Sequence, residues 1–212
     1  MIFTPDQAKN LEVLQKELQS ISTKVFEELV AGLISEILQI GVSVAKSGFQ
    51  HGADAGTAGR QGRNLRIECK RYQDKTSLKD RELLGEIDHA LKRDASLEAW
   101  ILASTRDVPE QLENDLFEKA LDVGLPIIII DWKSDYFNAM AALCCVSWQL
   151  VGDKVSPKAA SAVQSISDLA GEAIYKLKKD FESWYIGYPT LLNLSRKKLI
   201  EVWSDERESL SL

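Results

Sequence analysis

The sequence predicts an α/β domain followed by a helical segment. One segment of alternating apolar and charged residues, at 65–69, and two short apolar runs, at 99–103 and 127–130, alternate with two segments in which apolar residues recur every three or four positions. Apolar runs of this length are typical of buried strands, and the three- or four-residue spacing is typical of amphipathic helices. Strands joined by helices in this way lie parallel and side by side, through right-handed crossovers. We therefore expect a first domain, residues 1–133, built as a sheet flanked by helices.

Two helices are expected before these strands. Residues 5–20 carry leucines at helical spacing, and Thr4 and Pro5 are a typical pair of N-cap and first-turn residues. Residues 22–38 form a second apolar stripe, and Gly41 follows them as a C-cap would.

Two glutamates lie near the start of the second helix. Glu27 is at the edge of its apolar face, whereas Glu28 points away from the core. For either acid alone, a solvated position in the first turn is a sufficient explanation, because a negative charge there favours the helix N-terminus.

In the rest of the first domain we expect a strand at residues 42–46 and a glycine-rich stretch at 48–62. Two connecting helices are expected at 77–92 and 108–123. The glycine-rich stretch is typical of turns. Ser77 is a suitable N-cap for the first connecting helix, and Pro109 and Gly124 bracket the second. The four consecutive isoleucines at 127–130 predict a strand that is covered on both faces.

The chain changes character after Trp132. We predict a helix at residues 134–149, followed by a break at 152–153. A long helix at 156–186 would follow, then a second break at 187–189 and a return helix at 191–203. Residues 134–212 are therefore expected to form a helical extension. It would pack on the first domain, pack on a second copy of the chain, or link the chain to another module.

The composition is that of an ordinary globular protein, with 212 residues and a net charge of -6. This net negative charge argues against a protein that coats nucleic acid over its whole surface, but the charged residues are unevenly distributed along the sequence. Residues 60–81 hold eight basic and three acidic side chains. Such a basic strip suits contact with phosphates, and it is equally typical of a solvated face.

The three cysteines predict no disulfide, because Cys144 and Cys145 are adjacent and Cys69 lies in a strand. Neither these cysteines nor the two histidines have zinc-binding spacing. The N-terminus lacks a basic flank followed by an apolar core, and no apolar run approaches the ~20 residues that span a bilayer. We therefore expect a cytoplasmic protein with reduced thiols and no membrane partner.

The glycine-rich turn and the strand after it hold the residues most suited to chemistry. Asp54 lies in the turn, and Glu68 and Lys70 lie two positions apart at the strand end, so they share a face while Cys69 points the other way. A hairpin would bring Asp54 beside them. Two carboxylates make a hard oxygen site suited to Mg²⁺ or Mn²⁺, and the ammonium suits a phosphate or an activated water. On spacing alone, a structural ion pair is the commoner arrangement.

The order of these features resembles the Mrr-like branch of the PD-(D/E)xK restriction-endonuclease-like superfamily. The resemblance covers residues 25–132: a helix with Phe-Glu-Glu-Leu-Val, a strand, a Gly-Ala-Asp turn, the run Glu-Cys-Lys-Arg-Tyr, an amphipathic helix and a strand ending in Ala-Ser-Thr. It implies a restriction-endonuclease-like mixed central sheet flanked by helices. Ala53 stands where proline gives the motif its name, and many members have glutamine where Glu68 stands.

The resemblance implies a complete nuclease site, whose matched catalytic residues are Asp54, Glu68, Lys70 and Glu27. Asp54, Glu68 and the backbone carbonyl of Cys69 would hold one divalent cation, Mg²⁺ or Mn²⁺. Lys70 would orient the attacking water or stabilise the developing negative charge. Glu27 would bind a second metal or position the first. Backbone phosphates of DNA would be contacted by Arg66, Arg71 and Lys75.

The activity implied by the resemblance is that of a Mg²⁺-dependent DNA endonuclease, the effector domain of a bacterial anti-phage or restriction-type defence system. Its partners would be DNA, further copies of the chain in a dimer or larger oligomer, and a sensor or NTPase module outside this chain, since no G-x-x-x-x-G-K-[ST] loop occurs here. Two alternatives stay open. One is a catalytically silent nucleic-acid-binding or assembly module on the same fold, and the other is a structural α/β protein whose Glu68 and Lys70 form an ion pair.

Overall fold

The computed structural model describes residues 4–39, 41–44, 55–56, 64–72, 80–95, 97–133 and 138–182, and the chain divides into two units, residues 1–177 and 178–212. The helices are α1 (Pro5–Ser20), α2 (Thr23–Leu38), α3 (Asp80–Arg93), α4 (Glu110–Val123), α5 (Ala139–Cys144), α6 (Trp148–Lys154), α7 (Pro157–Ile166), the 3-10 helix η2 (Ser167–Leu169) and α8 (Gly171–Glu182). The strands are β1 (Ser43–Val44), β2 (Ala55–Gly56), β3 (Leu65–Lys70), β4 (Ala99–Ser104) and β5 (Ile127–Ile130).

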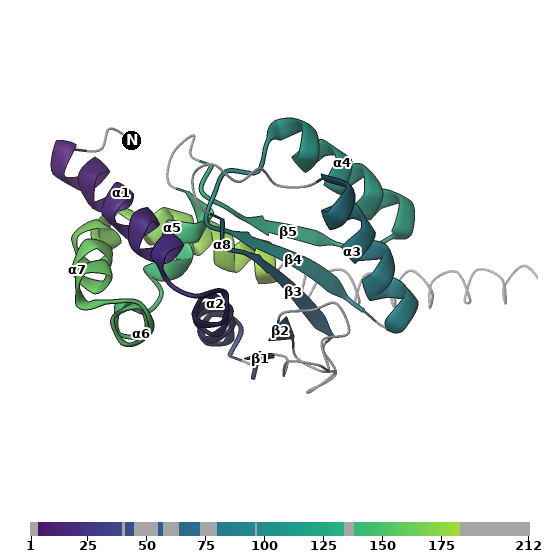
Figure 1. The fold of residues 1–212 in the computed structure, drawn as a ribbon, viewed down its shortest axis with the longest axis horizontal. Helices are drawn as coiled ribbons and strands as arrows, with labels where there is room; N and C mark the ends of the chain where they lie inside the picture. Colours follow the sequence, from purple (N-terminus) through teal and green to yellow (C-terminus); the bar gives the residue numbers. More distant parts are fainter. Residues whose placement is uncertain are drawn as a thin grey trace, which may run out of the picture. The chain divides into compact units, whose positions relative to one another are not determined.

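The five strands form one mixed sheet in the order β1-β2-β3-β4-β5. β1, β2 and β3 pair antiparallel, whereas β3, β4 and β5 are parallel and are connected by α3 and α4. Figure 1 shows α3 and α4 on one side of the parallel strands and α2 on the other. The prediction of neighbouring parallel strands is confirmed, and the chain is a mixed α/β protein in which helices predominate.

The core lies on both faces of β4, every residue of which is buried. On one face, Trp100 and Leu102 pack with residues of α3 and α4, among them Leu83, Ile87, Ala90, Leu112 and Leu116. On the other face, Ile101 and Ala103 are also buried, and α2 packs against the neighbouring strand β3. Parallel strands usually occur where both faces are shielded from water, and this sheet meets that condition at β4.

Among the described residues, several helix ends follow the capping signals of the sequence and one does not, whereas the predicted cap Ser77 lies outside the described residues. Thr4 caps α1 through a reciprocal capping box, and Gly124 ends α4 in the left-handed conformation, with φ 66°. The predicted cap of α2 at Gly41 is wrong, because Gln39 already adopts the left-handed conformation, with φ 54°. The side-chain amide of Gln39 donates a hydrogen bond to the carbonyl of Glu36, which helps to stabilise that end.

Two glycine-containing segments differ from the prediction. Ala55–Gly56 forms β2 within a stretch expected to hold only turns, because β1 and β3 pair with it on either side. Gly152 and Asp153 do not interrupt a helix but lie inside α6. A Cβ at Gly152 would sit 3.2 Å from the Cβ of Ala160, so this glycine permits close packing of α6 on α7.

The predicted long helix is divided into two. α7 ends at Ile166, and η2 separates it from α8, which begins at Gly171, a poor helix former. The apolar repeat nevertheless continues through the break, because Ile166, Ala170 and Leu177 are all buried.

The prediction that β5 is covered on both faces holds only in part: α4 and α5 contact the strand, and Ile127 and Ile129 pack against the core, but the cover is incomplete. Only Ile130 is buried, and the other three isoleucines are partly exposed. The reason is the position of β5 at the edge of the sheet that the described residues form, where a strand has a neighbour on one side only.

The helices after residue 138 pack on the N-terminal helices. α7 lies against α1, and α6 contacts both α7 and α2. At the contact with α2, Gly32 makes room for Leu150, whose Cδ2 would lie 2.7 Å from an added Cβ. Contacts therefore cross the predicted boundary at residue 133. The division into two domains stays a prediction, and the return helix at 191–203 lies outside the described residues.

No helix in the described ranges is both long enough and apolar enough to cross a membrane. The three cysteines are free thiols, as predicted. Cys69 and Cys144 are buried, whereas Cys145 is partly exposed.

Candidate functional site

Glu68 and Lys70 meet at the end of β3. The ammonium nitrogen of Lys70 lies 2.5 Å from Oε1 of Glu68, and the two side chains are 15% (Lys70) and 8% (Glu68) exposed. Their two-residue spacing places both groups on one face of the sheet, because side chains alternate along a strand. Little solvent screens the two charges from one another at this depth. The strand thus holds a carboxylate and an ammonium together in a poorly solvated position.

The register of the sheet places this pair on the side of α3. Residues in register on parallel strands project to the same face, and Glu68 is paired with Leu102, which belongs to the core under α3 and α4. Lys70 is paired with Ser104 at the carboxyl end of β4. The carboxyl ends of parallel strands are the usual place for ligands in open α/β sheets.

Glu27 lies on the buried face of α2. It is 7% exposed and stands in line with Val30 and Ile34, which are fully buried. A solvated first-turn position is therefore the wrong explanation for Glu27. Glu28 is partly exposed and pairs with Lys154 at 2.6 Å, and this hydrogen-bonded ion pair lowers the pKa of Glu28. Since α2 packs against β3, Glu27 belongs to a helix in contact with the strand of the ion pair.

Arg66 is buried beneath α3, with 8% of its surface exposed. Burial lowers the pKa of its guanidinium, and the neighbouring positive charge of Arg93 adds to this effect. Three surrounding carboxylates oppose the shift: Glu68, Glu86 and Asp94. Arg66 is therefore surrounded by charged groups of β3, of α3 and of the residue that follows α3, and its contact with phosphates stays a prediction.

Arg71 follows β3 and reaches the end of α1. Its NH1 donates a hydrogen bond of 2.7 Å to the main-chain carbonyl of Gln19, one of the last carbonyls of that helix. A cation at this point complements the negative end of the helix dipole. Arg71 therefore fixes α1 to the end of β3. Its predicted contact with DNA is not tested by this arrangement.

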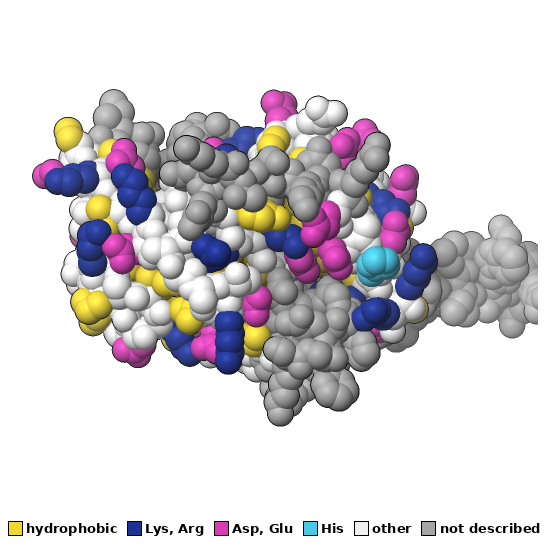
Figure 2. Space-filling view, in the orientation of Figure 1, with side chains coloured by type: hydrophobic (Ala, Val, Ile, Leu, Met, Phe, Trp, Pro, Cys, Tyr) yellow, Lys and Arg dark blue, Asp and Glu magenta, His cyan; other side chains and the backbone are white. Residues whose placement is uncertain are grey.

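Asp54 and Lys75 lie outside the described residues, as does most of the predicted basic strip. The three basic residues of the strip with described side chains, Arg66, Lys70 and Arg71, are buried or partly buried. On the face seen in Figure 2, the described lysines and arginines are interspersed with acids and do not gather into one basic area.

Metal ligands of the predicted kind are present only in part among the described residues. The carboxylate of Glu68 and the main-chain carbonyl of Cys69 are hard oxygen donors, which Mg²⁺ and Mn²⁺ prefer. No three His, Cys, Asp or Glu side chains of the described ranges are grouped so as to hold a metal ion. In β2, Ala55 is paired with Ile67, the residue before Glu68. Asp54 directly precedes Ala55 in the sequence and is needed to complete the predicted donor set.

Thr105, the last residue of the Ala-Ser-Thr run, lies near the site, and the sequence assigned it no role of its own. It is fully buried, and its hydroxyl hydrogen-bonds both the N–H and the carbonyl of Tyr72, two positions after Lys70. The available signal was a hydroxyl directly after a buried strand. Its partners are main-chain groups, however, which sequence patterns do not mark.

Asp131 is a second buried polar residue that sequence reasoning missed. Its carboxylate follows β5 and accepts hydrogen bonds from the N–H groups of Val108 (2.8 Å) and Lys133 (3.2 Å). Burial raises the pKa of Asp131, and the two hydrogen bonds oppose this shift. Nearby Asp107 and Glu113 raise it further. Asp131 thus holds the segment after β4 against the end of β5.

Comparison of the chain with protein-family models, with curated proteins and with solved structures gives no match. The resemblance to Mrr-like nucleases therefore depends on the order and spacing of its motifs alone. The mixed α/β architecture is observed, and its restriction-endonuclease-like character stays a prediction.

Proposed function

We propose that this protein is a metal-dependent DNA endonuclease that hydrolyses phosphodiester bonds. Asp54, Glu68 and Lys70 would be its catalytic residues, and Glu27, on the helix that packs against the opposite face of β3, would support the site from behind that strand. The observation that supports the proposal most is the contact between Glu68 and Lys70, 2.5 Å apart and nearly buried at the end of β3. A catalytic carboxylate and ammonium work best in such a position, since water weakens their interaction with a substrate.

Each residue has a physical role in the proposal. A bound Mg²⁺ or Mn²⁺ would polarise the scissile phosphate and lower the pKa of a coordinated water. Glu68 would offer a carboxylate oxygen to the cation, and the ammonium of Lys70 would turn to the attacking water or to the charge that develops on the phosphate. Glu27, buried on the adjacent helix α2, would orient this arrangement from behind β3.

The proposal includes the oligomeric state of the enzyme and its partners. Two copies would cut the two strands of a duplex, so a dimer or larger oligomer is part of it. A sensor or NTPase module on another chain would control an effector of anti-phage defence in the cytoplasm. Light scattering of the purified chain with and without DNA measures the oligomer directly.

A second candidate is a nucleic-acid-binding or assembly module without catalysis, in which Glu68 and Lys70 form a structural ion pair. The observation that favours it is the same short contact, because a buried carboxylate needs a partner whether or not it is catalytic. If the role is purely structural, removing one partner destabilises the fold by about 3–5 kcal/mol, and removing both charges restores much of that loss. Chemical denaturation of Glu68→Gln, Lys70→Met and the double variant measures this coupling, and cleavage assays on the variants that remain folded separate a purely structural role from a catalytic one.

The decisive experiment is incubation of the purified chain with supercoiled plasmid in Mg²⁺, Mn²⁺ or EDTA. We expect nicked or linear product with either cation, none with EDTA, and a loss of at least about 100-fold in Glu68→Gln and Lys70→Met. Matched controls are Glu12→Gln and Lys16→Met, since that pair is 3.9 Å apart and both side chains are more than 70% exposed. These controls should cleave as the wild type does.

Binding of Mn²⁺, measured by calorimetry, gives a readout that does not depend on turnover. We expect binding to the wild type to be lost in Glu68→Gln and in Asp54→Asn. A folded wild-type protein that binds DNA but neither binds Mn²⁺ nor cleaves would favour the second candidate and contradict the first.

A further inference from the structure

Thr105 joins three parts of the fold beside the ion pair. Its N–H donates to the carbonyl of Lys70 (3.1 Å), which extends the pairing of β3 and β4 by one residue. Its hydroxyl accepts the N–H of Tyr72 (3.0 Å) and donates to the carbonyl of Tyr72 (3.1 Å). Its own carbonyl accepts a hydrogen bond from Nε2 of Gln15 in α1 (3.1 Å). Thr105 has no exposed surface.

These bonds fix the chain immediately after the proposed catalytic lysine. β3 ends at Lys70, and beyond a strand the main chain has no ladder to hold it. The hydroxyl of Thr105 replaces that ladder, because it satisfies both polar main-chain groups of Tyr72 at once. The backbone at Lys70 is therefore held on both sides, by β4 before it and by Thr105 after it. A change in the backbone conformation at Lys70 would move the ammonium at the end of its long side chain away from the carboxylate of Glu68.

Gln15 and Arg71 anchor the same segment to α1. Gln15 bonds Thr105 itself, and Arg71, which lies between Lys70 and Tyr72, bonds the carbonyl of Gln19. The segment from Lys70 to Tyr72 is thus enclosed between β4 and α1. The hydroxyl of Thr105 can be removed by a substitution that leaves volume and shape almost unchanged, which is Thr105→Val.

We propose that Thr105 is a positioning residue that keeps the ammonium of Lys70 at the carboxylate of Glu68, and this proposal rests on the proposed nuclease function of that pair. The hydrogen bonds of Thr105 to this segment go to the main chain of Lys70 and Tyr72, so Thr105 acts through the main chain of residues 70–72. A displacement of about 1 Å at a catalytic group can cost up to ~100-fold in rate. Loss of the hydroxyl should therefore impair cleavage at temperatures where the protein is still folded.

The test compares Thr105→Val, which lacks the hydroxyl, with Thr105→Ser, which keeps it. Thr23→Val is the matched control, because Thr23 is exposed at the start of α2. Two quantities are measured on each folded protein. One is the pH profile of plasmid cleavage in Mn²⁺, and the other is the NMR signal of the Lys70 side chain in ¹³C-lysine-labelled protein, identified by its loss in Lys70→Met. If Thr105→Val does not fold, Thr105→Ala provides the variant without a hydroxyl.

We expect Thr105→Val to shift the Lys70 signal and to cleave at least about tenfold more slowly with an altered pH profile. Thr105→Ser and Thr23→Val should match the wild type in both measurements. A purely structural role of Thr105 would lower the melting temperature and leave the Lys70 signal and pH profile unchanged, and that result would overturn the proposal. Equal impairment of Thr105→Ser and Thr105→Val would overturn it too. If the Lys70 signal shifts as expected but the wild type cleaves no DNA, positioning stands and the nuclease function fails.

Discussion

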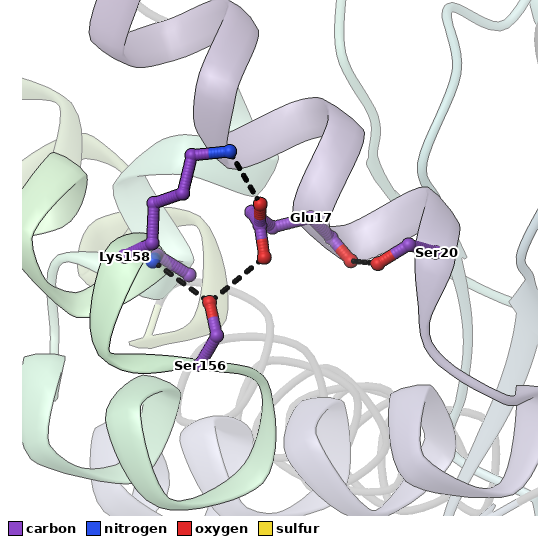
Figure 3. Close-up of polar contacts among 5 residues, drawn as sticks. Glu17, Ser20, Ser156 and Lys158 are labelled. Carbon is purple, nitrogen blue, oxygen red and sulfur yellow. Dashed lines mark hydrogen bonds and ion pairs between the residues drawn. The ribbon is translucent and has the colours of Figure 1, made fainter.

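The ammonium of Lys158 lies 2.8 Å from the carboxylate of Glu17, although the two residues are 141 positions apart in the sequence. The same carboxylate accepts a hydrogen bond from the hydroxyl of Ser156 (2.8 Å), which also caps α7 through the N–H of Ala159. Figure 3 shows Glu17 reaching from α1 to both residues at the start of α7. One side chain therefore ties the N-terminal helix to the first turn of a helix near the other end of the described chain.

Replacing Glu17 with glutamine should lower the free energy of unfolding at pH 7 by about 1 kcal/mol, because Lys158 is largely exposed and its ion pair is weakened by water. The hydrogen bonds from Lys158 and Ser156 lower the pKa of Glu17. A carboxylate with a lowered pKa stabilises the fold above its unfolded pKa, and this stability is lost as the pH falls through the folded value.

Denaturation by urea at pH 7 and at pH 3 measures this effect. The difference between wild type and Glu17→Gln should be largest at pH 7 and should shrink below the ordinary glutamate pKa of 4.5. Glu12→Gln on the exposed side of α1 is the control and should change stability little at either pH. A difference that is the same at both pH values would contradict the assigned role of the charge.

Three glycines should respond to alanine with different signs. In α3, nothing lies within 4 Å of an added Cβ at Gly85, so Gly85→Ala should stabilise the protein by about 0.5–1 kcal/mol through helix propensity. Gly124 ends α4 with φ 66°, where a side chain is strained, so Gly124→Ala should destabilise it by about 1 kcal/mol. In Gly32→Ala, the new Cβ would meet Leu150 at 2.7 Å, and overpacking should cancel or exceed the gain in propensity.

Chemical denaturation of the single variants and of Gly32→Ala combined with Leu150→Ala tests this reasoning. In the Leu150→Ala background the clash is gone, so Gly32→Ala should become stabilising. If Gly32→Ala changes the free energy of unfolding by the same amount in both backgrounds, the clash with Leu150 does not determine the effect of the substitution.

The elements that the sequence predicted well are those whose signals are local. The cap at Thr4, the stripe of α2 and the bracket of Pro109 and Gly124 around α4 depend on residues that are neighbours in the chain. β2 escaped prediction because its two residues, Ala55 and Gly56, form a strand through pairing with β1 and β3 and have no strand-forming pattern of their own.

The same distinction applies to the candidate site. Glu68 and Lys70 could be placed together from sequence, because a spacing of two on a strand fixes their face. The burial of Glu27 and Arg66 could not, since it results from how α2 and α3 pack on β3. Thr105 and Asp131 were missed for a further reason, which is that both bind main-chain groups brought to them by the fold.

The thiols should be slow to react in the native protein. Burial raises the pKa of Cys145 to about 11 and that of Cys144 still further, and Cys69 is also buried. Since the thiolate is the reactive form, a disulfide reagent at pH 8 should label the folded chain slowly and label all three cysteines quickly in guanidinium chloride. Rapid labelling of Cys69 or Cys144 in the folded protein would contradict the burial described for that thiol.

Asp131 should make stability depend on pH in the opposite direction from Glu17. Burial raises the pKa of Asp131, so its ionised form is disfavoured in the folded state. The cost of that charge is fully present above the raised folded pKa, decreases as the pH falls through it, and is absent below the ordinary aspartate value of 3.8. The wild type should therefore gain stability relative to Asp131→Asn, which carries no charge, as the pH is lowered towards 3.8.

Asp131→Ala should be less stable than either at pH 7, by about 1–3 kcal/mol, because the N–H groups of Val108 and Lys133 lose their acceptor. Melting temperatures of the three proteins between about pH 3.5 and pH 7 measure both effects. A wild type that loses stability relative to Asp131→Asn on acidification would contradict the prediction, because it would show that the hydrogen bonds affect the pKa of Asp131 more than burial does.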